Sequence, residues 1–259
     1  MASETTDVKI AYRITAVNER LAYAVETAEA LNIPKECIYL DAKHRGNIWN
    51  KFRIYEELKN QDSYTHVCMN DDDTIPVKNY KEIVETATRM FPDAIIAFYK
   101  PEARLKDRFE DSPYVQLLSN DCIGPGLVIP CKYLNNILQF YNKWLRESNY
   151  KWDDTTLKMW TLLNDIPVIL TIPNLVYIRP LQSTVRSKNA TQPNGECYIG
   201  HEINTEEFNT HKIKVMRTGR MFNPHLPKGH PLIDLCEKKF KENKDKAKRG
   251  FAYGGLINE

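Results

Sequence analysis

Three consecutive aspartates, Asp71 to Asp73, follow the short and largely apolar run His66-Val67-Cys68-Met69, with only Asn70 between them. Such a run is typical of a buried strand, and in open α/β sheets ligands bind just beyond the carboxyl ends of the strands. Carboxylates this close together repel one another unless a cation or hydrogen-bond donors compensate them. Because carboxylate oxygens suit Mg²⁺ and Mn²⁺, which often also bind substrate phosphates, the triplet predicts a metal-bridged diphosphate. The alternative is that the aspartates open a turn and cap the following helix, since Asp favours both positions.

The elements that would position these aspartates alternate between strands and helices. Apolar runs and helical spacing predict strands over 8–12, 37–40, 66–69 and 94–99, and helices over 18–31, 48–58 and from Pro76 to about Met90. The run over 94–99 is apolar throughout, as expected of a strand buried on both faces. Alternation of this kind indicates βαβ units, and therefore an α/β fold with a mostly parallel sheet. Asp41 would follow the second strand at the same edge as the triplet.

The second half of the chain supplies two further groups of candidate site residues. We expect strands over 114–118 and 127–129, helices over 132–147 and 155–163, and strands over 167–171 and 174–178. Gly124 and Gly126 lie between the first two strands, where the lack of a Cβ either admits a ligand to the main chain or forms a tight turn. Asp153 and Asp154 stand at a helix start, as catalytic groups or as a helix cap. The highly charged segment 100–112 and the polar segment 183–195 are predicted to be loops, and 232–248 a lysine-rich helix.

Composition restricts the class of protein. The 259 residues are 42% hydrophobic and 27% charged with a net charge of +2, which favours one large α/β unit and gives no global nucleic-acid signature. The six cysteines lack the paired spacing of a zinc site and are expected to be reduced thiols. We find no secretory signal and no run of membrane-spanning length, so we expect a cytoplasmic protein without a membrane partner. No obligate protein partner is evident.

The order of these motifs resembles that of GT-A glycosyltransferases. His66 to Asp73 resembles the family's strand-plus-DxD element, and Trp152-Asp153-Asp154 resembles its later acidic element. Further similarities are Gly124 to Pro130, Pro173-Asn174-Leu175-Val176 and Cys197-Tyr198-Ile199-Gly200. The resemblance implies a GT-A-like, Rossmann-like catalytic domain over 1–202, with a C-terminal extension over 203–259 that packs on it.

The resemblance also implies roles for individual residues. Asp71 and Asp73 would coordinate Mn²⁺ or Mg²⁺ at the diphosphate of a nucleotide sugar such as a UDP-sugar, although Asp72 could replace either ligand. The donor would contact Tyr12 and Arg13, in a loop after the first strand, together with Asp41, Asp71 and Asp72. Asp154 is the first candidate for the base that deprotonates the acceptor hydroxyl, and Asp153 is the second. Residues on the acceptor side would be Gly124, Gly126, Trp152, Arg186 and Lys188.

One family feature is missing, and the acceptor stays open. Many relatives have a histidine soon after the element matched by 173–176, whereas Tyr177, Ile178 and Arg179 follow here, and His201 and His211 lie further on. Arg179, Arg186 and Lys188 could instead hold a phosphate.

The compact chain with its basic tail resembles bacteriophage glycosyltransferases, which implies the host cytoplasm and, as one possibility, a hydroxymethylated base in DNA as acceptor. In that case Arg186, Lys188, Arg217, Arg220 and the lysine-rich tail would contact the DNA backbone.

The alternatives are a polysaccharide, lipid or protein acceptor, a nucleotidyltransferase-type enzyme, and a non-catalytic binding module with the same fold.

Overall fold

The structure is a computed structural model, which describes residues 7–99, 116–118, 124–147, 150, 152–171, 174–181, 213–214 and 226–248. The polar segment 183–195, the charged segment 100–112 and the stretch 197–200 lie outside the described residues. No described helix combines the length and apolar character that crossing a bilayer requires.

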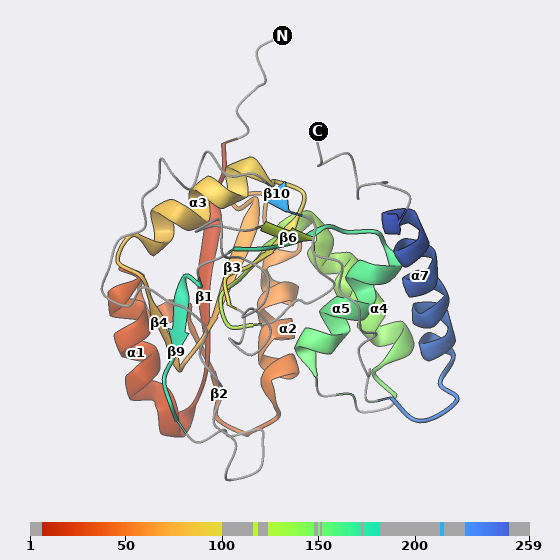
Figure 1. Ribbon diagram of the computed structural model, residues 1–259. Coiled ribbons are helices and arrows are strands. Elements are labelled where there is room, and N and C mark those ends of the chain that lie inside the picture. The colour runs from red at the N-terminus through yellow and green to blue at the C-terminus, as the bar shows by residue number, and fades with distance from the viewer. Residues whose placement is uncertain are drawn as a thin grey trace.

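The centre of the fold is a mixed sheet of eight strands in the order β10-β6-β8-β5-β7-β3-β1-β2 (Figure 1). Its strands are β1 (Ile10–Val17), β2 (Ile38–Asp41), β3 (His66–Asp71), β5 (Ile95–Ala97), β6 (Gln116–Leu118), β7 (Leu127–Pro130), β8 (Val168–Leu170) and β10 (Ile213–Lys214). The expected α/β fold with a mostly parallel sheet is confirmed. The exceptions are β7, which runs antiparallel to β3 and β5, and β6 with its parallel neighbour β10, because β6 runs antiparallel to β8. A short strand buried on both faces has the same apolar pattern in either direction, so the sequence does not reveal this reversal.

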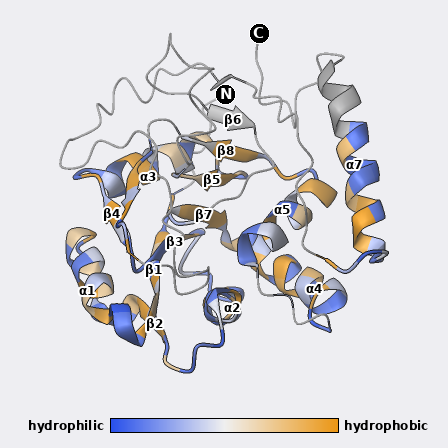
Figure 2. Ribbon diagram, turned by 60° about the horizontal axis from the view of Figure 1, so that its bottom comes forward, coloured by the Kyte–Doolittle hydropathy of each residue, from blue (hydrophilic) through white to orange (hydrophobic). Residues whose placement is uncertain are grey.

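Helices cover both faces of the sheet. One face packs against α1 (Leu21–Ala30) and α3 (Tyr80–Met90), and the other against α2 (Asn47–Leu58), α4 (Leu134–Trp144) and α5 (Asp153–Leu163). Alternate residues of β1 divide between the two cores: Ala11 faces the second group of helices, and Tyr12 and Ile14 face the first. Figure 2 shows the hydrophobic strands β5, β7 and β8 between these two helical layers.

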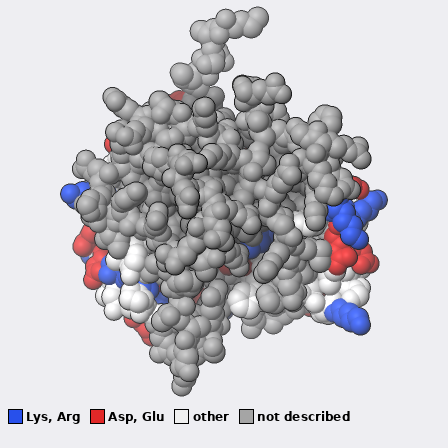
Figure 3. All heavy atoms as spheres, in the orientation of Figure 1, with Lys and Arg blue, Asp and Glu red and all other residues white. Residues whose placement is uncertain are grey.

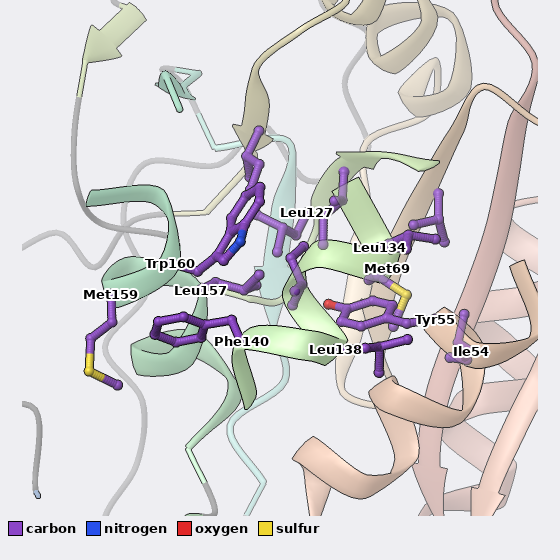
Figure 4. Close-up of a cluster of buried hydrophobic side chains, with 14 of the residues drawn as sticks. Ile54, Tyr55, Met69, Leu127, Leu134, Leu138, Phe140, Leu157, Met159 and Trp160 are labelled. Atoms are coloured by element: carbon purple, nitrogen blue, oxygen red, sulfur yellow. The ribbon is translucent and has the colours of Figure 1, made fainter. Parts of the chain in front are cut away.

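The larger of the two cores lies among β3, β7, α2, α4 and α5. Figure 4 shows Tyr55 of α2, Leu134 of α4 and Trp160 of α5 converging on Met69 and Leu127 of the sheet, and each of these side chains is almost fully buried. Burying apolar area on this scale is the main stabilising contribution to a domain of this size. This core therefore fixes α2 and α5 against the end of β3, where the candidate site lies.

Two smaller elements complete the description. The strands β4 (Thr74–Pro76) and β9 (Val176–Ile178) form an antiparallel pair that continues directly from the aspartate triplet. The C-terminal helix α7 (Pro231–Lys248) packs on α5: Leu232 and Cys236 join the larger core, and Lys239 donates a 2.6 Å hydrogen bond to Asp165. The strand β10, which also comes from beyond residue 202, joins the central sheet next to β6.

Candidate active site

The parallel register of three strands brings Asp41 and Asp71 to the same edge of the sheet. Val17 of β1 pairs with Asp41 at the end of β2, and Thr15 of β1 pairs with Asp71 at the end of β3. The predicted strand over 8–12 is too short, because β1 continues to Val17 and thereby lies between the two acids. The shared edge that the sequence predicted for these two aspartates is confirmed.

The triplet forms the turn from β3 into β4, and Arg20 joins its last two members. The Nη1 atom of Arg20 lies 3.2 Å from Oδ1 of Asp72 and 3.1 Å from Oδ2 of Asp73. The backbone N–H of Val17 donates to the second oxygen of Asp72 at 3.2 Å. The aspartates therefore open a turn, as the alternative prediction had it. They do not cap a helix, because a strand follows them and α3 begins only at Tyr80.

Asp71 has different partners from its two neighbours, namely Thr15 of β1 and Lys51 of α2. The hydroxyl of Thr15 donates to its Oδ1 atom at 2.8 Å, and Nζ of Lys51 lies 3.5 Å from the same oxygen. Neither of these contacts uses Oδ2 of Asp71. Asp71 thus has Oδ1 held by these two groups, and about a quarter of its side chain is exposed.

The electrostatics of the triplet are unfavourable to full ionisation. Burial, followed by the charge of Asp71, raises the pKa of Asp72 to about 6, and Arg20 only partly offsets this. Burial, followed by the charges of Asp71 and Asp72, raises the pKa of Asp73 to about 7. Near neutral pH, ionising these carboxylates therefore costs the folded protein free energy, and a bound cation would reduce that cost.

Lys51 connects the triplet to the second acidic pair. It lies on α2 with 2% of its surface exposed, and its Nζ atom donates to Oδ2 of Asp153 at 2.6 Å. The charge of Asp153, with that of Asp71, overcomes the effect of burial and raises the pKa of Lys51 well above its ordinary value. The ammonium is thus charged at any pH of interest and links β3 to the start of α5.

Asp153 and Asp154 have different surroundings although they are adjacent. Trp152 is the N-cap residue of α5, so both aspartates lie in the first turn of the helix, where the dipole favours negative charge. Asp153 is bound to Lys51, whereas Oδ1 of Asp154 accepts a 2.7 Å hydrogen bond from the N–H of Thr155. Burial, then the charge of Asp153, raises the pKa of Asp154, while Lys158 opposes the rise.

Asp41 is almost fully buried, and one of its oxygens has no hydrogen-bond partner. Oδ2 accepts a 2.8 Å hydrogen bond from the N–H of Gly46, which ties the 42–46 loop to the end of β2. Oδ1 is buried and has no hydrogen-bond partner among the described residues. Because an unsatisfied buried carboxylate oxygen is costly, a hydrogen-bond donor at this atom would stabilise the folded protein.

Two predicted donor residues, Tyr12 and Arg13, are not in a loop after the first strand. Both lie within β1, and Tyr12 is buried in the core under α1 and α3. The guanidinium of Arg13 contacts Glu57 at 3.5 Å and Cys37, which lies just before β2. It therefore points to the amino ends of the strands, away from Asp71. The prediction failed because the predicted strand ends too early, at Tyr12, just before the charged Arg13.

The two glycines predicted on the acceptor side have different roles. A Cβ on Gly126 would lie 3.2 to 3.3 Å from Val176 and Phe98, and the residue has φ = +75°, so close packing and backbone conformation require glycine there. A Cβ on Gly124 would lie 3.0 Å from Nζ of Lys51 and 3.9 Å from Oδ2 of Asp71. Gly124 thus borders the candidate site, whereas Gly126 is part of the core.

The remaining predicted residues divide into three groups. Trp152 is 37% exposed beside the acidic pair, where an acceptor contact is sterically open. The side chain of Arg179 instead pairs with Glu26 of α1 at 2.6 Å, so the suggestion that it holds a phosphate is not supported. The other candidates lie outside the described residues, namely Arg186, Lys188, His201, His211, Arg217 and Arg220.

The lysine-rich tail carries charges of both signs. In its described part, Lys238, Lys239 and Lys241 alternate with Glu237 and Glu242. Figure 3 shows basic and acidic side chains adjoining on the rim of the molecule where α7 lies. This part of α7 therefore does not form a uniformly positive surface.

Three site residues were not predicted: Thr15, Arg20 and Lys51. A signal for Lys51 was available, because positions 48, 51, 55 and 58 form one buried stripe of α2 on which Lys51 is the single charged residue. A charged side chain on a buried stripe requires a partner. The partner itself could not be inferred, since Asp153 is 102 residues away in the sequence.

The donor atoms suit a hard divalent cation bound in part by its substrate. Among the described residues no group of three or more His, Cys, Asp or Glu is placed to hold a metal ion. Five carboxylates nevertheless face three cationic side chains, so two negative charges remain when all are ionised: Asp71, Asp72, Asp73, Asp153 and Asp154 against Arg20, Lys51 and Lys158. Mg²⁺ is commonly bound by one or two carboxylates plus phosphate oxygens and water, and the residues fit that type of site.

Comparisons with known proteins identify no family. No family model matches the chain, and no curated protein matches it. Among solved structures, "Crystal Structure of A197 from STIV" is similar over 74% of this chain and 98% of that chain, with a TM-score of 0.45 and 12% sequence identity. A similarity at this level carries no inference about function.

Proposed function

We propose that this protein is a metal-dependent glycosyltransferase with a GT-A-like fold, which moves a sugar from a nucleotide-sugar donor to a hydroxyl acceptor. The observation that carries the proposal is the convergence of acids from separate elements at one edge of the sheet. Asp71 ends β3, Asp41 ends β2, and Asp153 begins α5, while Lys51 joins the first and last of these. A site built in this way can bind a nucleoside on one side and an acceptor on the other.

The nucleoside would bind at the end of β2. An acid after the second strand of a Rossmann-like unit is well placed to accept a hydrogen bond from a ribose hydroxyl. Asp41 offers an unpaired Oδ1 for that purpose, and its other oxygen holds the adjacent loop through Gly46. Asp41 would therefore orient the ribose of the nucleotide.

The diphosphate would bind at the triplet. Asp71 and Asp73 would hold Mn²⁺ or Mg²⁺, and Arg20 would hold Asp72 and Asp73 in place from the protein side. When bound, the cation would act as a Lewis acid that neutralises the negative charge developing on the departing nucleoside diphosphate. Thr15 fixes the orientation of Asp71 through its 2.8 Å hydrogen bond.

The acceptor hydroxyl would be deprotonated by Asp154. A general base is most effective when its pKa is close to the working pH, and burial beside Asp153 raises the pKa of Asp154 in that direction. Asp153 is the weaker candidate because its carboxylate is engaged by the ammonium of Lys51. The exposed ring of Trp152, next to this pair, would provide a surface on which the acceptor can stack.

Among acceptors, a hydroxymethylated base in phage DNA is our preferred proposal, and a polysaccharide, lipid or protein hydroxyl is the alternative. The mixed charge in the described part of α7 gives that helix no advantage for DNA. The proposal for DNA thus depends on the basic residues beyond 181 that the sequence singled out. Binding to DNA that weakens steeply with salt would support it, because phosphate contacts release counterions.

The test is titration with a panel of nucleotide sugars, with and without Mn²⁺, following binding by calorimetry and donor hydrolysis by release of the nucleoside diphosphate. We expect metal-dependent binding of one donor, and its loss in Asp71→Asn. Release of pyrophosphate from a nucleoside triphosphate would instead identify a nucleotidyltransferase. If the protein binds no nucleotide sugar and no nucleoside triphosphate, it is neither a glycosyltransferase nor a nucleotidyltransferase.

A further inference from the structure

Two exposed arginines at the start of α2 stack on one tryptophan. The Cζ atom of Arg45 lies 4.5 Å from the centroid of the Trp49 ring, and that of Arg53 lies 4.7 Å from it. Arg53 also lies 5.6 Å from the ring centroid of Tyr39, on the edge strand β2, and donates a 3.3 Å hydrogen bond to the carbonyl of Leu40. We call the three aromatic and basic side chains of 45, 49 and 53, together with Tyr39, the stacked ladder.

The acids near the stacked ladder do not neutralise its charge. The two glutamates of the same helix, Glu56 and Glu57, pair instead with Lys59 at 2.5 Å and with Arg13 at 3.5 Å. In the described part of the chain, neither arginine of the ladder forms an ion pair with a carboxylate. Lys43, in the loop before α2, adds a further exposed positive charge. The ladder is therefore complementary to an anionic partner.

The stacked ladder lies beside the acidic site but not within it. The buried stripe of α2 carries Lys51, which contacts Asp71 and Asp153. Trp49 and Arg53 are each two positions from Lys51, and two positions turn a helix by about 200°, so they lie on the other side of a helix about 10 Å wide. Figure 2 shows the loop that leads from β2 into α2 as a hydrophilic stretch at the edge of the molecule. A partner that contacts both the ladder and the acids must therefore extend across α2.

We infer that the stacked ladder binds the phosphate backbone of DNA, beside the site in which a hydroxyl of that DNA accepts the sugar. Guanidinium groups bind phosphate oxygens in a planar, bidentate geometry, and stacking on a ring orders them before the ligand arrives. A polymer with a negative charge at every phosphate can contact both arginines and also extend across α2 to the acids, whereas a single nucleotide is too short.

A purely structural stack does not explain the second arginine. One guanidinium on the ring of Trp49 is enough to stabilise the exposed side of α2, and a second like charge on the same ring adds repulsion. The inference rests on the proposed function and on its preferred acceptor. It adds a DNA-contacting surface among the described residues to the basic residues beyond 181.

The test measures binding of a labelled short DNA duplex by fluorescence anisotropy over a range of salt concentrations. Arg45→Gln/Arg53→Gln should weaken binding roughly tenfold whatever the sequence of the duplex, because phosphate contacts carry no sequence information. It should also reduce the slope of log K against log salt by about two, since each phosphate contact contributes about 0.9.

Trp49→Leu separates the stacking from the charge. It keeps both arginines but removes the ring that orders them, so binding should weaken a few-fold while the salt slope stays unchanged. Arg89→Gln is the matched control, because Arg89 is an exposed arginine of α3, on the opposite face of the sheet. It should change neither affinity nor slope. Thermal unfolding of every variant checks that the fold is retained.

Three outcomes would contradict the inference. If the double arginine variant binds the duplex with wild-type affinity and slope, the ladder is only structural, while the proposed function stands. If the ladder binds vesicles of phosphatidylglycerol and not the duplex, its partner is a lipid surface. If the wild type binds neither, the inference and the DNA acceptor both fail, and the titration with nucleotide sugars decides separately whether the protein is a glycosyltransferase.

Discussion

Replacing Asp73 by asparagine should make the protein more stable at alkaline pH while removing one ligand of the proposed metal site. The pKa of Asp73 is raised from 3.8 to about 7 in the folded protein, chiefly by burial and by the neighbouring Asp71 and Asp72. The folded state therefore binds the proton more tightly than the unfolded state does. By linkage, stability falls as pH rises from about 4 to about 7, and the loss is complete above the folded pKa.

The magnitude follows from the separation of the two pKa values. Each pH unit between them is worth about 1.4 kcal/mol, so ionising Asp73 at pH 8 costs the folded state about 4 kcal/mol. The side chain is 17% exposed, so solvent screening reduces this value and we expect a gain of about 2 to 4 kcal/mol for Asp73→Asn. At pH 4 the carboxyl is protonated in the folded protein, and the two proteins should be about equally stable.

The assay is urea denaturation at pH 4, 6 and 8, in chelator and again in Mn²⁺. In chelator the advantage of Asp73→Asn should grow with pH, and Mn²⁺ should stabilise the wild type but not the variant. Asp62→Asn, which changes an exposed aspartate before β3, serves as the control and should show neither effect. If Asp73→Asn is less stable than the wild type at pH 8, the electrostatic reasoning for the triplet is wrong.

Two further predictions concern the core and the proposed base. Gly126→Ala should destabilise the protein by about 2 to 4 kcal/mol in urea denaturation. Residue 126 has a positive φ, and the added Cβ would lie 3.2 to 3.3 Å from Val176 and Phe98. If the variant is as stable as the wild type, the turn can relax. Asp154→Asn should lower kcat by at least a hundredfold with little change in donor affinity, and should remove the acidic limb of the pH–rate profile; an unchanged profile would assign the base elsewhere.

The sequence predicts the strands well where an uninterrupted apolar run defines them. The start of β3 at His66 and the position of β7 match the expectation, because each is an apolar segment, although β3 continues two residues past the predicted end at Met69, to Asp71. β1 was ended too early because Arg13 interrupts its apolar residues. The period-two alternation of Ile10, Tyr12 and Ile14 continues through Arg13 and shows that the strand does not stop there.

The site is less predictable because its decisive contacts are tertiary. Nothing local in the sequence indicates that Arg20 would reach Asp72 and Asp73, or that Lys51 would meet Asp153. Lys51 lies on α2 and Arg20 lies just before α1, and the hydrophobic core fixes both helices against the sheet. Side-chain chemistry can thus be read from the sequence, whereas which charges meet depends on how the helices pack.

The division of charge around the triplet argues for function over a structural turn. Arg20, just before α1, engages Asp72 and Asp73, and Lys51, on α2, engages Asp71 on the other side. A turn between β3 and β4 needs at most one aspartate, and here burial, together with the adjacent aspartates, raises the pKa of Asp72 and Asp73 and weakens the fold. Two buried cations reduce that cost without removing it. Residual strain of this kind at the carboxyl edge of a sheet is expected where a cationic ligand completes the site.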